Sequence, residues 1–261
     1  MAGAAERHHH RPAWRRRGHL RWVPHDIAWR TAVLFMIGSA CFALGAFPPF
    51  TRWVPTAFVG IVFFVGSLFF TTAGYSQYLQ SLNRELLAAR RAWPDAPRQR
   101  LRLLGLQPHR VDWWACVVQS IGTLWFNINT FAAMHQGLTV HQQNVHIWAP
   151  DYIGSLCFLF ASQLALWEVC GRPVCVCRGD TDWWIAIINM AGSIWFMISA
   201  TAAFVLPATT SLLDATKANS GTFFGAVCFF WAARLLIKET DQEAATRTPP
   251  PGARPGSQRA P

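Results

Sequence analysis

The feature that most constrains this chain is a set of long apolar runs that carry no charge, or a single charge near one end. An α-helix needs about 20 such residues to cross a hydrocarbon core of roughly 30 Å. With 52% hydrophobic residues among 261, the chain is also too apolar for an ordinary soluble domain. The sequence therefore predicts an all-α polytopic membrane protein with six transmembrane helices. The runs are Thr31–Thr51, Trp53–Asn83, Trp113–Met134, Tyr152–Cys170, Trp183–Leu213 and Ala218–Ile237.

The basic residues predict how these helices are oriented, because Lys and Arg in short loops stay on the cytoplasmic side. With six spans, all of the 23 basic residues except Arg52 and Lys217 fall on one side. We therefore expect both termini in the cytoplasm. The net charge of +10 is spread over loops and tails that flank the spans. Attraction to anionic lipid explains this charge better than nucleic-acid binding does.

The spans and the polar segments between them predict seven regions. Residues 1–26 and 239–261 form disordered cytoplasmic tails, the first of them basic. Residues 79–111 form an amphipathic, basic loop that lies along the cytoplasmic leaflet or binds a partner helix. Residues 171–181 form a cytoplasmic loop that contains cysteines. Residues 27–78, 112–170 and 182–238 form three transmembrane hairpins.

Two of the hairpins share a sequence. "DWWACVVQSIGTLWFNINTFAA" at 112–133 resembles "DWWIAIINMAGSIWFMISATAA" at 182–203, and the similarity resumes in the returning helices. We expect Asp112 and Asp182 to cap their helices and the paired tryptophans after them to form an aromatic belt at headgroup depth. Asp151, Asn219 and Ser220 look like caps of the returning helices.

A fainter third copy lies at the amino end. Trp29, Gly38 and Phe42 match Trp183, Gly192 and Phe196, and Gly60 and Phe64 then match Gly154 and Phe158. All three hairpins begin on the same side of the membrane, so we expect parallel repeats related by rotation about the membrane normal.

A polar stripe follows the third span, where Gln119, Thr123, Asn127 and Thr130 share one face of the helix. Such a stripe either makes interhelical hydrogen bonds, with Gln163 or Ser162 as partners, or lines a hydrated path. No charged residue lies near the middle of any span, which argues against an ion-coupled pump.

Two loops contain residue types that bind metals in other proteins. His135, His141, His146 and Asp151 gather on the extracytoplasmic side and could hold zinc or copper, although their spacing defines no shared helical face. Ordinary interfacial histidines are the alternative. Cys170, Cys175 and Cys177 match no paired C-x-x-C pattern, and on the cytoplasmic side we expect them to be reduced. Metal binding and redox sensing remain open for them.

The segments "WAPDYIGSLCFLFAS", "INMAGSIWFMISATAAFVLP" and "ANSGTFFGAVCFF" resemble actinobacterial multi-pass membrane proteins with YrhK-like domains. The resemblance covers residues 112–237 and implies a location in the bacterial inner membrane and a repeat architecture. It implies no catalytic residue and no cofactor. The leading hypothesis is a non-enzymatic structural or regulatory protein whose cytoplasmic segments meet anionic lipid, a partner protein or a second copy of the chain. A small permease or channel along the polar stripe is the first alternative. A membrane metalloprotein that uses the histidines is the second.

Overall fold

The computed structural model describes Pro24, residues 26–93 and residues 99–247. Within these residues the regular structure is helical, apart from one isolated β-bridge between Val205 and Leu212. Six long helices form the body: α1 (Ile27–Ala46), α3 (Thr56–Leu82), α5 (Val111–Ala132), α7 (Ala149–Cys170), α8 (Thr181–Ala202) and α9 (Ala215–Arg247). Short helices join them: α2 (Pro48–Trp53), α4 (Arg84–Ala92), α6 (Val140–Gln143) and the π-helix η2 (Asn144–Trp148). The predicted all-α class is confirmed.

Five of the described helical stretches are long and apolar enough to cross a membrane. They are Ile27–Ala46, Thr56–Leu82, Val140–Cys170, Thr181–Ala202 and Ala215–Ile237. The third of these joins α6, η2 and α7 into one stretch. The 22-residue helix α5 is absent from this set. Gln119, Asn127 and Asn129 are among the polar residues that lower its hydropathy.

The six long helices form a closed ring in which each packs against two neighbours. Around the ring the order is α1, α3, α5, α7, α8, α9 and back to α1. The contact of α1 with α9 closes the ring and buries Trp29, Ala32 and Ile237. Helices that follow one another in the chain are therefore neighbours in space.

Six phenylalanine rings fill the centre of this ring, one from each long helix. The phenylalanine cluster comprises Phe42, Phe70, Phe126, Phe158, Phe196 and Phe229, all at most 6% exposed. The rings of Phe42, Phe126 and Phe196 form a triangle with centroids 5.8 to 6.3 Å apart. Phe70, Phe158 and Phe229 form a second triangle with centroids 5.6 to 6.1 Å apart. Because lipid is as apolar as phenylalanine, the cluster stabilises the bundle mainly through close packing.

A glycine lies four residues before each of these phenylalanines and is followed by a small residue, so that G-[SAT]-x-x-F occurs once in every long helix. The glycines meet in pairs where α1 crosses α3, α5 crosses α7 and α8 crosses α9. A methyl group on any of them would lie 3.0 to 3.2 Å from the partner's carbonyl oxygen, and it would also meet side-chain atoms. Glycine thus lets the two backbones approach closely. The pairs are Gly38 with Gly66, Gly122 with Gly154, and Gly192 with Gly225.

These contacts correct the alignment expected for the first hairpin. Gly66 and Phe70 occupy the positions on α3 that Gly154 and Phe158 occupy on α7. The predicted match at Gly60 and Phe64 is therefore out of register. Gly60 instead faces Met134 at the end of α5.

The helix starts also differ from the prediction. Both α5 and α8 begin one residue before the expected cap, so Asp112 and Asp182 lie in the first turn. The side chain of Asp180 caps α8 by accepting from the backbone N–H of Asp182 at 3.0 Å. Asp112 is held instead by the guanidinium of Arg110. On α9, Asn219 and Ser220 lie within the helix rather than at its start, which Asp214 caps.

The paired tryptophans divide between two environments, where an aromatic belt was expected for both. Trp113 and Trp183 are buried inside the bundle, and Trp114 and Trp184 are exposed on its surface. The indole N–H of Trp114 donates to the carbonyl of Pro108 at 3.0 Å, and that of Trp184 to Arg178 at 3.0 Å. One tryptophan of each pair thus packs helices together while the other ties down the preceding loop.

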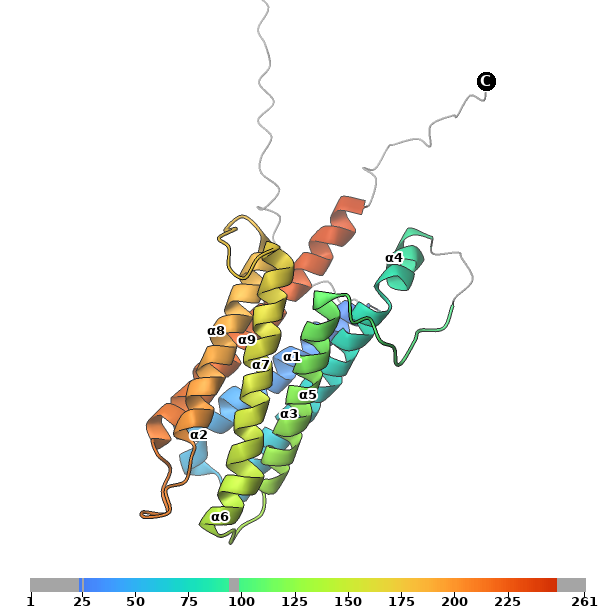
Figure 1. Ribbon diagram of the computed structural model, residues 1–261. Helices are drawn as coiled ribbons and strands as arrows, with labels where there is room; N and C mark the ends of the chain where they lie inside the picture. The colour runs from blue at the N-terminus through green and yellow to red at the C-terminus, as the bar shows by residue number, and fades with distance from the viewer. Residues whose placement is uncertain (1–23, 25, 94–98, 248–261) are drawn as a thin grey trace, which may run out of the picture.

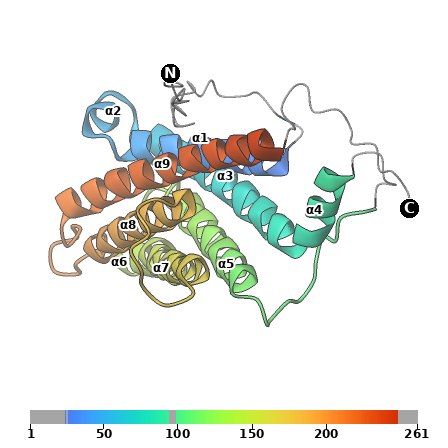
Figure 2. The same cartoon turned by 90° about the horizontal axis from the view of Figure 1, so that it is seen from above.

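The connections fall at two ends of the bundle. In Figure 1, α2, α6 and the loop between α8 and α9 lie at one end, and α4 and the loop between α7 and α8 lie at the other. Arg84, Arg172 and Arg178 belong to segments at the second end, whereas Arg52 and Lys217 belong to segments at the first. Viewed from above in Figure 2, α4 extends away from the long helices.

Helix α9 continues to Arg247, beyond the expected end of the last hairpin at residue 238. The region 239–261 is therefore helical in its first part, where a disordered tail was expected. The rest of that region, and residues 1–23 of the expected amino-terminal tail, lie outside the described residues.

Candidate functional site

The polar stripe on α5 faces α3 and is hydrogen-bonded to it. The hydroxyl groups of Thr130 and Ser67 lie 3.0 Å apart, and Asn127 Nδ2 donates to Thr71 Oγ1 at 2.8 Å. The Thr71 hydroxyl also lies 3.4 Å from the carbonyl oxygen of Thr123. We call Ser67, Thr71, Asn127 and Thr130 the polar seam. It joins two helices by side-chain hydrogen bonds, which is the usual role of uncharged polar residues within a membrane.

Gln163 and Ser162, the expected hydrogen-bond partners of the stripe, bond to other residues instead. Gln163 donates to the carbonyl of Pro173 at 2.8 Å, and the Ser162 hydroxyl lies 2.8 Å from that of Ser193. Both therefore act at other contacts of α7. Asn127 Oδ1 is buried without a hydrogen-bond partner among the described residues. Gln119 is half-buried on α5.

Small polar residues bridge other neighbouring helices in the same way. Besides the Ser162–Ser193 bond between α7 and α8, the Ser199 hydroxyl lies 2.7 Å from that of Thr222 between α8 and α9. Gln80 Nε2 donates to Thr31 Oγ1 at 2.7 Å between α3 and α1. Ser199, Thr222, Gln80 and Thr31 were not singled out from the sequence.

The basic loop before α5 is fastened to the end of α3. Asn83 Oδ1 accepts from the backbone N–H of Arg102 at 2.8 Å, and its Nδ2 donates to the Arg102 carbonyl at 2.9 Å. Tyr78 accepts through its hydroxyl oxygen from the N–H of Gly105 at 3.0 Å. These bonds hold the backbone of residues 102–105, while the side chain of Arg102 stays exposed. The loop therefore presents basic groups from a fixed backbone.

Asp112 is the centre of a charged group at the same end. Arg110 forms an ion pair with it and also donates to the carbonyl of Ser81 at 3.0 Å. The Ser81 hydroxyl donates to Asp112 Oδ2 at 3.2 Å, and Arg84 lies 3.8 Å from the same oxygen. Asp112 thus joins the ends of α3 and α5. The prediction that Asp112 caps its helix did not include this contact.

The histidines of the α5–α7 connection are exposed and do not converge. His135 and His146 line a groove of about 340 Å³ with Phe131 and Leu138, and His141 is not part of its wall. Asp151 points elsewhere and accepts from Asn129 Nδ2 at 2.7 Å. Within the described residues, no three His, Cys, Asp or Glu side chains are close enough to hold one metal ion.

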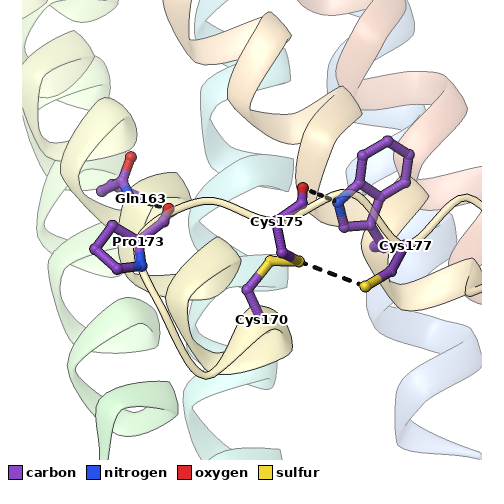
Figure 3. The surroundings of a disulfide bond; sticks show 6 residues. Gln163, Cys170, Pro173, Cys175 and Cys177 are labelled. Atoms are coloured by element: carbon purple, nitrogen blue, oxygen red, sulfur yellow. Dashed lines mark hydrogen bonds between the residues drawn. A yellow bond between two sulfur atoms is a disulfide. The ribbon is translucent and has the colours of Figure 1, made fainter.

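The cysteines of the α7–α8 loop form a compact group (Figure 3). Cys170 and Cys175 are joined by a disulfide, where reduced thiols were expected. The free thiol of Cys177 lies 3.6 Å from the sulfur of Cys175. The loop closes in this way because Gly171 adopts a left-handed conformation, with φ of 63°, and turns the chain back after α7.

Comparison with protein-family models, curated proteins and solved structures gave no match for this chain. The resemblance of residues 112–237 to YrhK-like proteins therefore remains a prediction. The arguments about function that follow rest on the residues and contacts described above.

Proposed function

We propose that this chain is a six-span protein of the bacterial inner membrane, built from three parallel hairpins, that acts without catalysis as a structural or regulatory platform. In this proposal α5 is the sixth span, and the hairpins are α1 with α3, α5 with α7, and α8 with α9. The paired glycines at each hairpin crossing support the grouping. Helix α5 crosses the bilayer because its polar side chains bond to α3 instead of meeting lipid.

The phenylalanine cluster is the observation that supports a function without transport. Its six rings come from all six long helices and lie against one another at the centre of the bundle. A pathway along the bundle axis would have to displace them. Close-packed rings of this kind resist displacement because each loses many favourable contacts on moving.

The cytoplasmic end is the surface through which such a platform would act. The exposed Arg84, Arg100 and Arg102, together with Arg172 and Arg178 of the next loop, place positive charge at one end of the bundle. Each basic residue near an anionic membrane surface contributes about 1 kcal/mol of attraction. Anionic lipid headgroups of the inner leaflet are therefore the proposed ligand of this end.

A permease along the polar stripe has less support. Thr130 and Asn127, which would form its wall, are hydrogen-bonded to Ser67 and Thr71 of the neighbouring helix. Opening a path along the stripe would break these bonds within a medium that offers no replacement.

Reconstitution of the full chain in liposomes tests the two functions against each other. We expect ion and small-solute flux equal to that of protein-free liposomes, both for the natural sequence and for Asn127→Leu. If the natural protein gave a higher flux, and if this excess disappeared in Asn127→Leu and Gln119→Leu, the protein would be a permease and not a platform.

Lipid retention tests the ligand of the cytoplasmic end. Native mass spectrometry of protein extracted from mixed vesicles should show fewer bound anionic lipids in the double variant Arg100→Gln, Arg102→Gln than in the natural sequence. Arg52→Gln, at the opposite end, is the matched control and should retain the natural number. Equal retention by all three proteins would contradict the proposed ligand.

A further inference from the structure

The three sulfurs of the α7–α8 loop differ in how far solvent reaches them. Cys175 is 6% exposed and packs with Leu166, Trp183 and Ala186 between α7 and α8. Its carbonyl accepts from the indole N–H of Trp183 at 2.9 Å, which fixes the backbone on this side. Cys170 is half-buried at the end of α7, and Cys177 is exposed. Solvent therefore meets the group mainly at Cys177.

The position of Cys177 suits attack on the disulfide. Figure 3 shows its side chain directed at the sulfur of Cys175, and the two atoms lie 3.6 Å apart. Exchange between a thiol and a disulfide begins with this approach of a free thiolate to one of the bonded sulfurs. The buried side of Cys175 is covered by Trp183, so the neighbouring Cys177 is the nucleophile best placed to reach it.

The surroundings also favour exchange over a permanent crosslink. The loop includes Arg172 and Arg178, and the distribution of basic residues assigns this end to the cytoplasm. Thiol pools keep cytosolic cysteines reduced, and the disulfides that do form there are usually transient.

We propose that Cys170, Cys175 and Cys177 form a thiol–disulfide exchange site whose substrate is a dithiol, with Cys177 as the residue that meets it. First, Cys177 loses its proton to water and its thiolate attacks the sulfur of Cys175. The Cys175–Cys170 bond breaks, a Cys175–Cys177 bond forms, and Cys170 leaves as a thiolate that takes up a proton. This step moves the disulfide to the surface without net oxidation.

The dithiol then reduces the relocated disulfide. One of its thiolates attacks the exposed sulfur of Cys177 and releases Cys175 as a thiolate, which is protonated. The second thiol of the reagent attacks the reagent sulfur that is bonded to Cys177 and releases Cys177. The reagent leaves as a disulfide. The protein now has three free thiols and has gained two electrons and two protons. This site adds thiol–disulfide exchange to the proposed platform, and its cytoplasmic surroundings rest on the membrane orientation proposed above.

Timed reduction by dithiothreitol tests the relay in the full-length protein purified in detergent under air. Free thiols are alkylated at intervals and the peptides are mapped by mass spectrometry. The natural protein should begin with Cys170–Cys175 bonded and Cys177 alkylated. Cys177→Ser should slow reduction by about tenfold or more, because the relay is lost, while the equilibrium ratio of oxidised to reduced Cys170 and Cys175 stays the same. Val176→Ser, at the exposed neighbouring position, is the control and should react at the natural rate.

A second variant keeps the test independent of the first. In Cys170→Ser, oxidation with an excess of glutathione disulfide should produce a Cys175–Cys177 disulfide. The proposal is overturned by equal reduction rates in Cys177→Ser and the natural protein, by a Cys170→Ser protein that forms no such bond, or by an isolated natural protein in which all three thiols are alkylated.

Discussion

Gly122 of α5 and Gly154 of α7 meet so closely that a methyl group on either would lie 3.1 Å from the carbonyl oxygen of the other. The same added methyl groups would lie 2.9 Å from Cys157 Cβ or from an edge atom of Phe126. Neither backbone can yield without moving its helix. This contact therefore fixes both the distance between the two helices and the place of Phe126 in the phenylalanine cluster.

Replacing this glycine should destabilise the bundle. Gly122→Ala forces α5 and α7 apart, and overpacking of this kind costs about 1 to 3 kcal/mol. Gly74→Ala is the matched control, because a methyl group there would lie 3.5 Å from the nearest side-chain atom, at ordinary contact distance. Unfolding against SDS mole fraction should show a loss of stability for Gly122→Ala and little change for Gly74→Ala. Equal midpoints for the two variants would contradict the close contact.

Removing a ring from the phenylalanine cluster should leave a cavity. Phe126→Ala is expected to lower the free energy of unfolding by about 3 to 5 kcal/mol, the range for buried phenylalanine. Phe160→Ala makes the same chemical change on α7 at a side chain that is 63% exposed, where lipid can fill the space. SDS unfolding should separate the two variants clearly. A Phe160→Ala protein as unstable as Phe126→Ala would show that the centre is not packed as described.

The polar seam should contribute a measurable but modest coupling. Thr130→Val and Ser67→Ala each remove one partner of the 3.0 Å hydrogen bond between α5 and α3. A double-mutant cycle isolates the interaction, and such cycles within membranes average about 0.6 kcal/mol. A coupling free energy of that order is expected. Strict additivity of the two substitutions would mean that the hydroxyl groups do not bond.

The start of α9 should depend on pH through Asp214. The backbone N–H of Lys217 and then its ammonium group, 3.1 Å away, hold the pKa of this carboxyl below its ordinary value. Because the folded pKa is lowered, the stabilising bonds are fully present above the ordinary value and are lost as the pH falls through the folded one. NMR titration of the Asp214 carboxyl should give a lowered pKa in the natural protein. In Lys217→Gln, which keeps the backbone N–H, the pKa should rise part of the way back. An ordinary pKa in the natural protein would contradict this account of the cap.

Much of the architecture follows from the sequence, because a run of uncharged apolar residues has few alternatives to a helix in lipid. The stripe on α5 was also readable, since Thr123, Asn127 and Thr130 share a face whatever surrounds them. Its partners on α3 were not, because Ser67 and Thr71 are common residues in an apolar run. Only the position of α3 in space distinguishes them from Ser162 and Gln163.

The remaining differences have local physical causes. The register of the first hairpin depends on which glycine of α3 meets Gly38, and both Gly60 and Gly66 precede a phenylalanine by four residues. The small residue that follows Gly66, Ser67, distinguishes it from Gly60, which Ile61 follows, but the alignment of the first hairpin did not use this difference. The disulfide escaped prediction because the loop was expected on the cytoplasmic side, where thiols are kept reduced. It depends on the left-handed turn at Gly171, which returns Cys175 to within 5.6 Å of Cys170 between their Cα atoms.

The proposed function depends on the arrangement of the spans. The crossing of the membrane by α5 is the part of this arrangement that most needs a test. Epitope tags inserted singly after residues 140, 178 and 215 of the full chain can be probed with antibody in intact spheroplasts and in permeabilised ones. We predict that the tags after 140 and 215 are reached in intact spheroplasts and that the tag after 178 is reached only after permeabilisation. A tag after 140 that is shielded in intact spheroplasts would mean that α5 does not cross, and the three-hairpin arrangement would be wrong.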